Sequence, residues 1–489
     1  DLYSGGITNH TRGGIEFGEF PATEGAYQVE YGGYWDVAIL KYDSAGGQLL
    51  YATYLGGSGA ETPHSTIVNE DGELIIMGTT SSTNFPLTSG AYQGSFNGGT
   101  DASVTINYPG GTDFFISKLS ADGSQLLAST YFGGSANDGI NPSSQPLARN
   151  YGDELRGDVN VDPSGNIYIT SSSSSPDLFA GIDSAKVTRQ YGGGVTDGIV
   201  AKFSPDLQFL IWGSFLGGSG VDGSYSVKLD QFNNVFLAGG TTSADFPIAG
   251  GFDPTFGGEV DGWIAVLTAD GADIARSTYL GTPEYDQVYF LDLDSEENVF
   301  VFGQTNGLGF PVSEGTYRNL ASGQFIQKYS KLLDQRLMST TFGDGFPEPD
   351  ISPTAFLVNE CNNIYVAGWG SGVNSFAPSS FRPFYNRLST SGLPITPNEA
   401  QQETTNGSDF YLAVFSDDAE RFLHGTFFGG GDAVVHVDGG TSRFDKAGIV
   451  YHAVCADCGF GQASTFTTTE GAWSRENLAV SEGLIGCNN

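Results

Sequence analysis

The sequence predicts an all-β fold, a β-propeller of four-stranded antiparallel blades, with seven blades preferred to six. Three observations support this prediction. A short motif of apolar residues followed by glycines recurs six times, four strand-like segments recur in a fixed order around it, and the 489 residues include 71 Gly, 23 Tyr and 35 Phe. Short segments rich in β-branched and aromatic residues, separated by Gly-rich turns, favour strands. We find no sustained helical spacing of apolar residues.

The repeated motif places large apolar residues directly before a glycine pair or a variant of it. We assign it to the end of the second strand of each unit, near the crowded propeller axis, because glycine tolerates a positive φ and has no side chain to collide there. The motif is therefore predicted to stabilise the fold and to carry no chemistry. Its copies read TYLGGSG (53–59), STYFGGS (129–135), SFLGGSG (214–220), STYLGTP (277–283), TTFGDGF (340–346) and TFFGGGD (426–432).

The first segment of each unit is almost entirely apolar, as in DVAILKY from Asp36 and DFFISKL from Asp113. Because a strand covered on both faces reads as a continuous apolar run, we assign this segment to the innermost strand. Connectors such as EFPATEGAYQ (19–28) and TFTTTEGAWS (465–474) are expected to join the outer strand of one blade to the inner strand of the next. Their Tyr or Trp is expected to fill the gap between blades.

We expect a single propeller domain over residues 1–489. Its repeat units cover roughly 36–93, 113–196, 197–260, 261–322, 323–408 and 409–474. Residues 1–35 and 475–489 would form a closing seventh blade from both ends of the chain, because pairing of terminal strands removes exposed sheet edges.

Loops in an antiparallel meander alternate between two faces of the molecule. The turns between the first and second strands, and between the third and fourth, are short. The long insertions at 94–112, 135–156 and 374–408 all belong to the other face. We expect that face to bind ligands, since functional loops gather on one side of a rigid scaffold; neutral growth of surface loops is the alternative.

The chain carries 56 Asp and Glu against 20 Lys and Arg, a formal net charge of −36. Such a surface repels phosphate backbones and anionic lipids, so no nucleic acid partner is expected. We prefer solubility in a salty medium as the role of this charge. Calcium capture by carboxylates is the alternative, and no other cofactor is expected. No apolar run reaches the ~18 residues that span a bilayer and no signal peptide is visible, so we expect a soluble chain without membrane insertion.

Motifs of known reactive sites do not occur in the sequence. There is no H-E-x-x-H zinc motif, no G-x-S-x-G nucleophile turn and no Walker-type phosphate loop, so we assign no catalytic, cofactor-binding or metal-binding residue. A carboxylate pair for glycoside hydrolysis stays open, because 56 acidic residues allow many pairings.

The four cysteines all lie in the last third of the chain. In an acidic chain of exported character they are candidates for two structural disulfides that hold the closing blades, in one of the three pairings that four cysteines allow. The C-A-D-C pair also looks like half of a zinc ribbon or a redox pair, but no second C-x-x-C accompanies it. The candidates are Cys361, Cys455, Cys458 and Cys487.

The repeat unit resembles a known bacterial family. D-x-F-I-x-K-L, Y-L-G-G-S-G-x-D, V-D-x-x-G-N-I-Y-V-x-G and F-P-x-T-x-G-A-Y-Q together resemble the seven-bladed bacterial β-propeller repeat (SBBP-type), over nearly the whole chain. The segments NECNNIYVAGWGS (359–371) and HVDGGTSRFDKAGIVYHAVCADCG (436–459) are similar to a version in large cell-surface proteins of the Bacteroidetes. Those proteins are secreted by the type IX route and are associated with gliding motility.

This resemblance implies an extracellular or cell-surface protein without catalytic residues. Its implied partners are type IX outer-membrane components or further modules of the same polypeptide. Ser44 and Ser184 each stand in a D-S-A triplet, which resembles the O-glycosylation signal of that phylum; at Ser44 a simple turn is the alternative.

Two functions follow as hypotheses. The first is a non-catalytic scaffold or adhesion module that presents its long-loop face to protein or glycan. The second is a secreted polysaccharide hydrolase or lyase. Because propellers support both, the axis discriminates between them. A plugged axis favours the module, whereas an acid cluster with Arg and aromatic residues at the axial mouth favours the enzyme.

Overall fold

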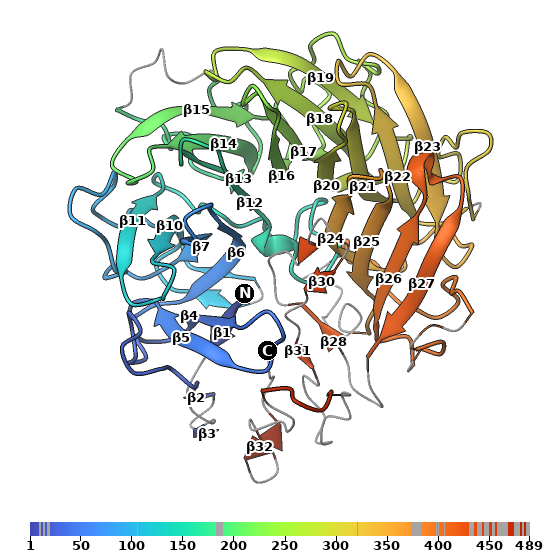
Figure 1. The fold of residues 1–489 in the computed structure, drawn as a ribbon. Coiled ribbons are helices and arrows are strands. Elements are labelled where there is room, and N and C mark those ends of the chain that lie inside the picture. The colour runs from blue at the N-terminus through green and yellow to red at the C-terminus, as the bar shows by residue number, and fades with distance from the viewer. Residues whose placement is uncertain are drawn as a thin grey trace.

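Six sheets are arranged radially around a central axis in the computed structural model (Figure 1). The structure describes the chain except residues 9–10, 13–14, 17–19, 105, 182–188, 320, 373–382, 398, 400, 405, 430–434, 438–442, 445–448, 452–454, 457–467, 474–479, 482–483 and 486–489.

Five of the sheets have four antiparallel strands and one has three. In sheet order they are β1 (Leu2–Thr8), β4 (Asp36–Tyr42) and β5 (Leu49–Leu55); β6 (Glu61–Val68), β7 (Leu74–Thr80), β10 (Asp113–Leu119) and β11 (Leu126–Phe132); β12 (Asp158–Val161), β13 (Ile167–Ser173), β14 (Asp197–Phe203) and β15 (Leu210–Leu216); β16 (Asp222–Leu229), β17 (Val235–Thr241), β18 (Asp261–Leu267) and β19 (Ile274–Leu280); β20 (Asp286–Leu293), β21 (Val299–Thr305), β22 (Gln324–Tyr329) and β23 (Arg336–Phe342); and β24 (Ser352–Val358), β25 (Ile364–Trp369), β26 (Phe410–Phe415) and β27 (Phe422–Phe428).

The remaining elements are short. Five two-stranded ribbons pair β2 (Thr11–Arg12) with β3 (Ile15–Glu16), β8 (Ala102–Ser103) with β9 (Asn107–Tyr108), β28 (Val435–His436) with β31 (Cys455–Ala456), β29 (Arg443–Phe444) with β30 (Val450–Tyr451), and β32 (Val480–Ser481) with β33 (Leu484–Ile485). Two 3-10 turns, η1 (Asp153–Leu155) and η3 (Asp417–Ala419), complete the elements of the described chain.

The described residues form six blades, so the preference for seven was wrong. The first strand, β1, pairs directly with β4 from Leu2↔Tyr42 to Thr8↔Asp36. It therefore belongs to the first sheet, which has three described strands, instead of contributing to an additional one. The ends of the chain do approach each other: Trp473 of the last connector lies edge-on to Tyr42 of β4, with ring centroids 5.8 Å apart.

The order of strands within a blade also differs from the prediction. Sheet order and Figure 1 place β12, β16, β20 and β24 nearest the axis, while β15, β19, β23 and β27 lie at the rim. The apolar segment that we assigned to the innermost strand is the third strand, as in β18. A middle strand is covered on both faces by the neighbouring blades, so its residues are buried whether or not it lies at the axis. The inner strands are more polar; β16 carries Asp222, Ser224 and Ser226.

It follows that the glycine motif ends the outermost strand and leads into the inner strand of the next blade. Each four-stranded sheet takes its inner two strands from one predicted repeat unit and its outer two from the next. The serine of the motif contacts that next blade: Ser219 donates from its N–H and its Oγ to Asp245 Oδ1, at 2.8 and 3.0 Å. The predicted structural role of the motif is consistent with these contacts.

The connectors run within a blade, from its second to its third strand, and not between blades as predicted. Their backbone follows the outermost strand, where Thr88 Oγ1 accepts the Ser129 N–H (2.9 Å) and Gln93 O accepts the Tyr131 N–H (3.3 Å). This pairing covers an edge that would otherwise expose unpaired backbone groups.

The connector aromatic does fill the gap between blades, as predicted. Tyr92 lies edge-on to Phe203 of the next blade at 5.6 Å, and its N–H donates to Leu207 O at 2.9 Å. Tyr317 also crosses to the next blade, where its ring stacks on that of Phe422 with centroids 5.1 Å apart.

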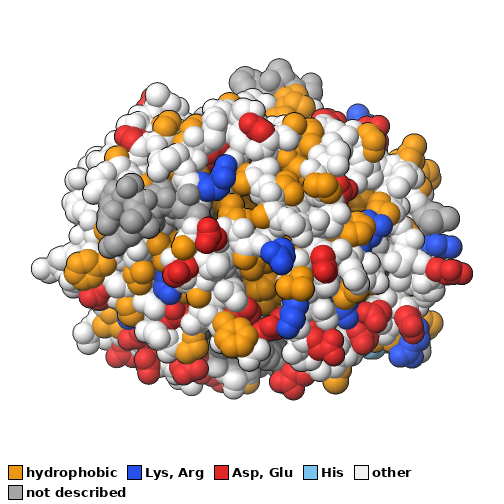
Figure 2. All heavy atoms as spheres, turned by 90° about the horizontal axis from the view of Figure 1, so that it is seen from above, with side chains coloured by type: hydrophobic (Ala, Val, Ile, Leu, Met, Phe, Trp, Pro, Cys, Tyr) orange, Lys and Arg blue, Asp and Glu red, His pale blue; other side chains and the backbone are white. Residues whose placement is uncertain are grey.

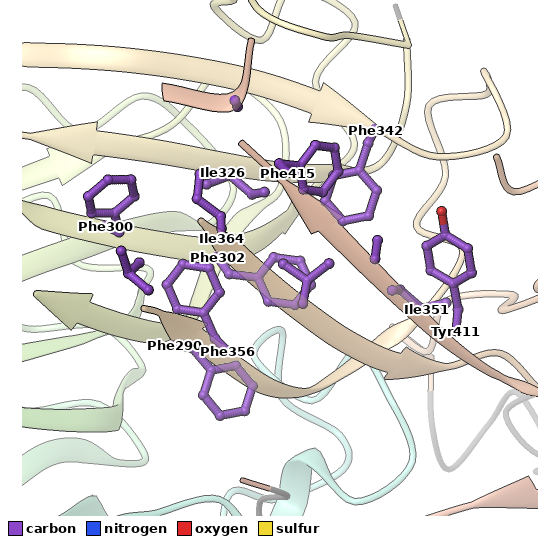
Figure 3. Close-up of a cluster of buried hydrophobic side chains, with 14 of the residues drawn as sticks. Phe290, Phe300, Phe302, Ile326, Phe342, Ile351, Phe356, Ile364, Tyr411 and Phe415 are labelled. Atoms are coloured by element: carbon purple, nitrogen blue, oxygen red, sulfur yellow. The ribbon is translucent and has the colours of Figure 1, made fainter. Parts of the chain in front are cut away.

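The core consists of such aromatic layers between blades. Figure 3 shows the layer between the fifth and sixth blades, where the ring of Phe302 lies 6.0 Å from that of Phe342 and 5.8 Å from that of Phe356. Aromatic pairs of this kind contribute about 0.5–1.5 kcal/mol each beyond the burial of their area. The blades are thus held together mainly by apolar side chains.

Candidate functional site

The axis is filled by an insertion within the inner strand of the third blade. Asp138 bridges Ser173, and the ladder resumes only at Asp158, which pairs with Thr170. The residues between them fold over the axis and include η1, the short turn at the centre of Figure 1. We call this insertion, residues 139–157, the axial plug.

Asp153 is the centre of the axial plug. Its carboxylate accepts the N–H groups of Arg149 (3.0 Å) and Asn150 (2.8 Å). It also accepts the hydroxyl of Tyr289 (2.9 Å) and pairs with Arg156 Nε (2.7 Å). Asp153 is only 1% exposed. A buried charge with this many donors is compensated within the protein and has little capacity left for a ligand.

Aromatic rings surround the charged groups of the plug. The Arg149 guanidinium lies 4.0 Å from the ring centroid of Tyr285, and that of Arg156 lies 4.4 Å from Tyr289. Burial raises the pKa of both phenols above its ordinary range, so they stay protonated and donate hydrogen bonds. These stacked cations anchor the plug on the fifth blade.

The other two long insertions pack on the plug. Ile106 and Tyr108, from the insertion at 94–112, share a buried cluster with Ile140 and Leu155 of the plug. From the insertion at 374–408, the Asn386 N–H donates to Arg149 O at 2.7 Å. We call the described parts of these three insertions the axial cap.

A shallow depression lies beside the plug, lined in part by Tyr151, Arg156, Ser352 and Trp369. Also in the axial cap, the Tyr385 hydroxyl donates to Glu154 Oε1 at 2.5 Å, but Glu154 is itself closed to solvent. The axis therefore shows both the feature expected of a binding module and the feature expected of an enzyme. The axis is plugged, and an acid, Arg and aromatic cluster exists there, but its carboxylates are buried.

A second polar feature recurs between blades and was not assigned from the sequence. An acidic residue begins the third strand of one blade, and another begins the inner strand of the next. These residues are Asp36 and Glu61, Asp113 and Asp138, Asp197 and Asp222, and Asp261 and Asp286, all at most 1% exposed. The sequence signals are the acid that follows the glycine motif, as in G-S-G-x-D, and the Asp that begins the apolar segment, but neither indicates by itself that two acids of different blades meet.

Two of the four predicted disulfide cysteines can be placed. Cys361 is exposed in the turn between β24 and β25 and is unpaired within the described chain. Cys455 lies in β31. Cys458 and Cys487 lie outside the described residues. The disulfide pairing stays a prediction.

Ser44 is exposed in the turn after β4. The neighbouring Asp43 carboxylate accepts the N–H groups of Gly47 and Gln48, at 2.8 and 3.1 Å, as expected of a turn-forming Asp. Ser184 lies outside the described residues. O-glycosylation at both positions stays a prediction.

The described histidine side chains are not arranged as metal ligands. His64 is fully buried in β6, its Nε2 lies 2.9 Å from Thr79 Oγ1, and burial lowers its pKa to about 3. His424 is exposed beside Glu399, at 3.1 Å. Within the described ranges, no three His, Cys, Asp or Glu residues converge as metal ligands.

The face that bears the short turns is strongly acidic. Figure 2 views the molecule from its edge, with Asp and Glu gathered along the lower margin and apolar side chains scattered between polar ones. The short turns expose Lys331 and Arg421 as bases. Against them stand the exposed acids Glu70, Asp71, Asp122, Asp206, Asp270, Asp273, Glu296, Asp334, Glu360, Asp417, Asp418 and Glu420.

These sheets and this filled axis define a β-propeller with an axial cap. No family model and no curated protein matches the sequence. Solved structures with a similar arrangement include a protein of unknown function from Bacteroides caccae (7% identity, TM-score 0.36, covering 80% of this chain and 89% of that chain). Others are the Dos1 propeller (8%, 0.36, 86% and 71%) and a PL25 ulvan lyase, a polysaccharide lyase (10%, 0.40, 88% and 83%).

In the part of the chain that the structure describes, no helix has the length and apolar character needed to cross a membrane.

Proposed function

We propose that this chain is a non-catalytic scaffold or adhesion module of an extracellular or cell-surface bacterial protein. It binds protein or glycan through the axial cap. The observation that supports this most is the filled axis, where the charged groups bind each other and the surrounding backbone. Asp153 accepts the N–H groups of Arg149 and Asn150 and pairs with Arg156.

The axial cap suits binding because it is continuous and rests on a rigid base. Three insertions from different blades meet on it, so a ligand would contact loops whose backbones are fixed by buried clusters and hydrogen bonds. Asp101, Asn107 and Arg387 are exposed on these insertions and offer both charges and an amide. Recognition loops on a rigid scaffold commonly have this arrangement.

Binding to immobilised polysaccharides and to outer-membrane surface proteins tests the proposal. The cap variant combines Asn107→Ala with Arg387→Ala, and the matched control combines Asp206→Ala with Phe232→Ala on the short-turn face. We expect at least about tenfold weaker binding for the cap variant, since two contacts of about 0.7 kcal/mol each suffice for that factor, and no change for the control. Equal loss in both variants would contradict a cap-mediated interaction.

The second candidate is the enzyme, favoured by the depression beside Arg156 and by the Tyr385–Glu154 hydrogen bond in the axial cap. Incubation with anionic and neutral polysaccharides, followed by reducing-end and unsaturated-uronate assays, distinguishes it. Turnover that is abolished in Glu154→Gln would establish catalysis and overturn the non-catalytic proposal.

A further inference from the structure

The acidic residues between blades form pairs that share one small space. At the third interface, Asp197 begins β14 and Asp222 begins β16 of the next blade. Gly217 lies against both: a Cβ there would stand 2.6 Å from Asp197 Oδ1 and 2.8 Å from Asp222 Oδ2. The first and fourth interfaces have the same arrangement, at Gly56 and Gly281.

The two carboxyl groups of a pair are bonded differently. Asp222 accepts Thr241 Oγ1 on Oδ1, and the Gly218 N–H (2.9 Å) and Ser243 Oγ (2.7 Å) on Oδ2. Asp197 Oδ2 accepts the Gly192 N–H at 2.6 Å, but the buried Asp197 Oδ1 has no hydrogen-bond partner among the described residues. Within the same part of the chain, the equivalent oxygens of Asp36 and Asp261 also lack one.

The fifth interface shows which kind of group can lie against the second acid of a pair. Gln324 stands there in place of the first acid. In the orientation that satisfies both atoms of its amide, its Nε2 donates to Asp350 Oδ2 at 3.1 Å. A neutral amide with an N–H donor has the shape of a protonated carboxyl group with its O–H donor.

From this geometry we propose that the carboxyl pairs at the first, third and fourth interfaces each hold one shared proton. In this state one acid of the pair donates its O–H to the other, from Asp197 to Asp222 at the third interface. The pairs make the packing of the blades dependent on pH. When the proton is lost, two carboxylates face each other in a buried space, and the contact between the blades is weakened.

Among the described residues, few other charges face these pairs. Asp245 and Arg189 interact with Asp197, and the phenols of Tyr191 and Tyr279 lie nearby. At the first interface, Glu61 interacts with Asp36, and the phenols of Tyr108 and Tyr131 lie nearby. The remaining charged neighbours are Asp253 and Glu284 at the fourth interface and Asp344 at the fifth. Most of these neighbours are acidic, so they favour retention of the shared proton.

The direction of the pH effect follows from the titration of the buried acids. Burial raises the pKa of Asp197 to about 8 and that of Asp222 to about 6, and it raises the pKa of Asp36 to about 6 and that of Glu61 to about 7. The folded state thus holds the proton more tightly than the unfolded state. The stabilisation is fully present near pH 4 and is lost as the pH rises through 6 to 8.

A bound divalent cation is the competing occupant. Calcium takes six to eight oxygen ligands, whereas each pair offers two carboxylates, of which the second already accepts several donors. The Gln324 interface lacks even the first carboxylate. A shared proton therefore fits the donor pattern better than calcium does.

Thermal unfolding of the intact chain between pH 5 and 9, in EDTA, tests the proposal with Asp197→Asn. The Asn amide supplies a neutral N–H donor, as Gln324 does at the fifth interface. We expect the midpoint to equal that of the wild type at pH 5 and to exceed it by about 1–3 °C at pH 8.5, because a neutral donor no longer has a proton to lose. Asp71→Asn, at an exposed turn, is the matched control and should change neither value.

The reverse variant, Gln324→Glu, introduces a carboxyl pair at the fifth interface. It should leave stability near pH 5 almost unchanged and lower the midpoint at pH 8.5. A pH profile identical to the wild type in both variants would overturn the proposal. So would a gain in midpoint on adding calcium at pH 8.5 that Asp197→Asn abolishes, because the pair would then hold a cation.

Discussion

Gly217 shows how a single residue can limit the approach of two blades. Its Cα lies against two acidic side chains from different sheets, and a Cβ would enter the space between them. Since cores are close-packed, a neighbour must move when a methyl group is added there. The constraint is steric and does not depend on an unusual backbone conformation.

Gly217→Ala should therefore lower the free energy of unfolding by about 1–3 kcal/mol, the range found for overpacked cores. Gly309 is the matched control, because no atom of the described chain lies within 4 Å of its Cβ position. Gly309→Ala should be nearly neutral. Urea denaturation measures both, and equal midpoints for the two variants would contradict the close approach.

His64 provides the opposite pH dependence to the carboxyl pairs. Its ring is buried, and burial lowers its pKa to about 3, so the folded state favours the neutral form. The stabilisation is present above about pH 6.5 and is lost as the pH falls below it, by up to about 1.4 kcal/mol per pH unit. His64→Gln should flatten the loss of stability between pH 6.5 and 4.5 in urea titrations. An unchanged slope would show that His64 is not buried as the neutral ring.

Among the elements, the axial plug fills the space at the propeller axis with packed side chains. It interrupts the inner strand of the third blade, which leaves β12 only four residues long. Asp153 accepts a hydrogen bond from Tyr289 of the fifth blade, and its ion-pair partner Arg156 lies over the ring of the same tyrosine. Blades that are not neighbours in the ring are thereby linked through the axis.

Asp153→Ala should destabilise the fold by about 3–5 kcal/mol, because removing one partner leaves Arg156 buried without its counter-ion. Asp71→Ala, at an exposed turn, should stay within about 0.5 kcal/mol of the wild type. Denaturant titrations of both variants provide the comparison. A small effect at Asp153 would mean that the plug contributes little to stability.

For the molecule as a whole, Trp473 marks the contact between the two ends of the ring. It is 41% exposed where it lies against Tyr42, whereas many aromatic contacts between the other described blades, such as that of Phe302 with Phe356, are buried. Local opening is expected to concentrate where few apolar groups are buried.

Trp473→Ala should raise amide hydrogen exchange in β1, β4 and β5 while leaving β16 to β19 unchanged. The change should be modest, about 1 kcal/mol of local opening free energy, as for a half-exposed aromatic contact. Mass spectrometry of exchange-labelled peptides resolves these regions. Uniform acceleration across all blades would show instead that the ring opens as one unit.

Much of the fold could be predicted because local residue patterns specify its strands and turns. Glycine, turn residues and β-branched runs specify strands and turns within a few positions, and their recurrence indicates a radial repeat. The gap-filling role of Tyr92 was predicted for the same reason. The candidate site was harder: the plug could be seen only as a long insertion, and the network around Asp153 joins residues from distant parts of the chain.

Repeated four-stranded antiparallel blades follow from the residue pattern alone, because strand and turn preferences are local properties. The number of blades, the strand that lies at the axis and the meeting of Asp197 with Asp222 depend on long-range packing. An apolar run looks the same whether a strand is covered by neighbouring blades or by the axis. Two acids of different blades come together only when the ring packs.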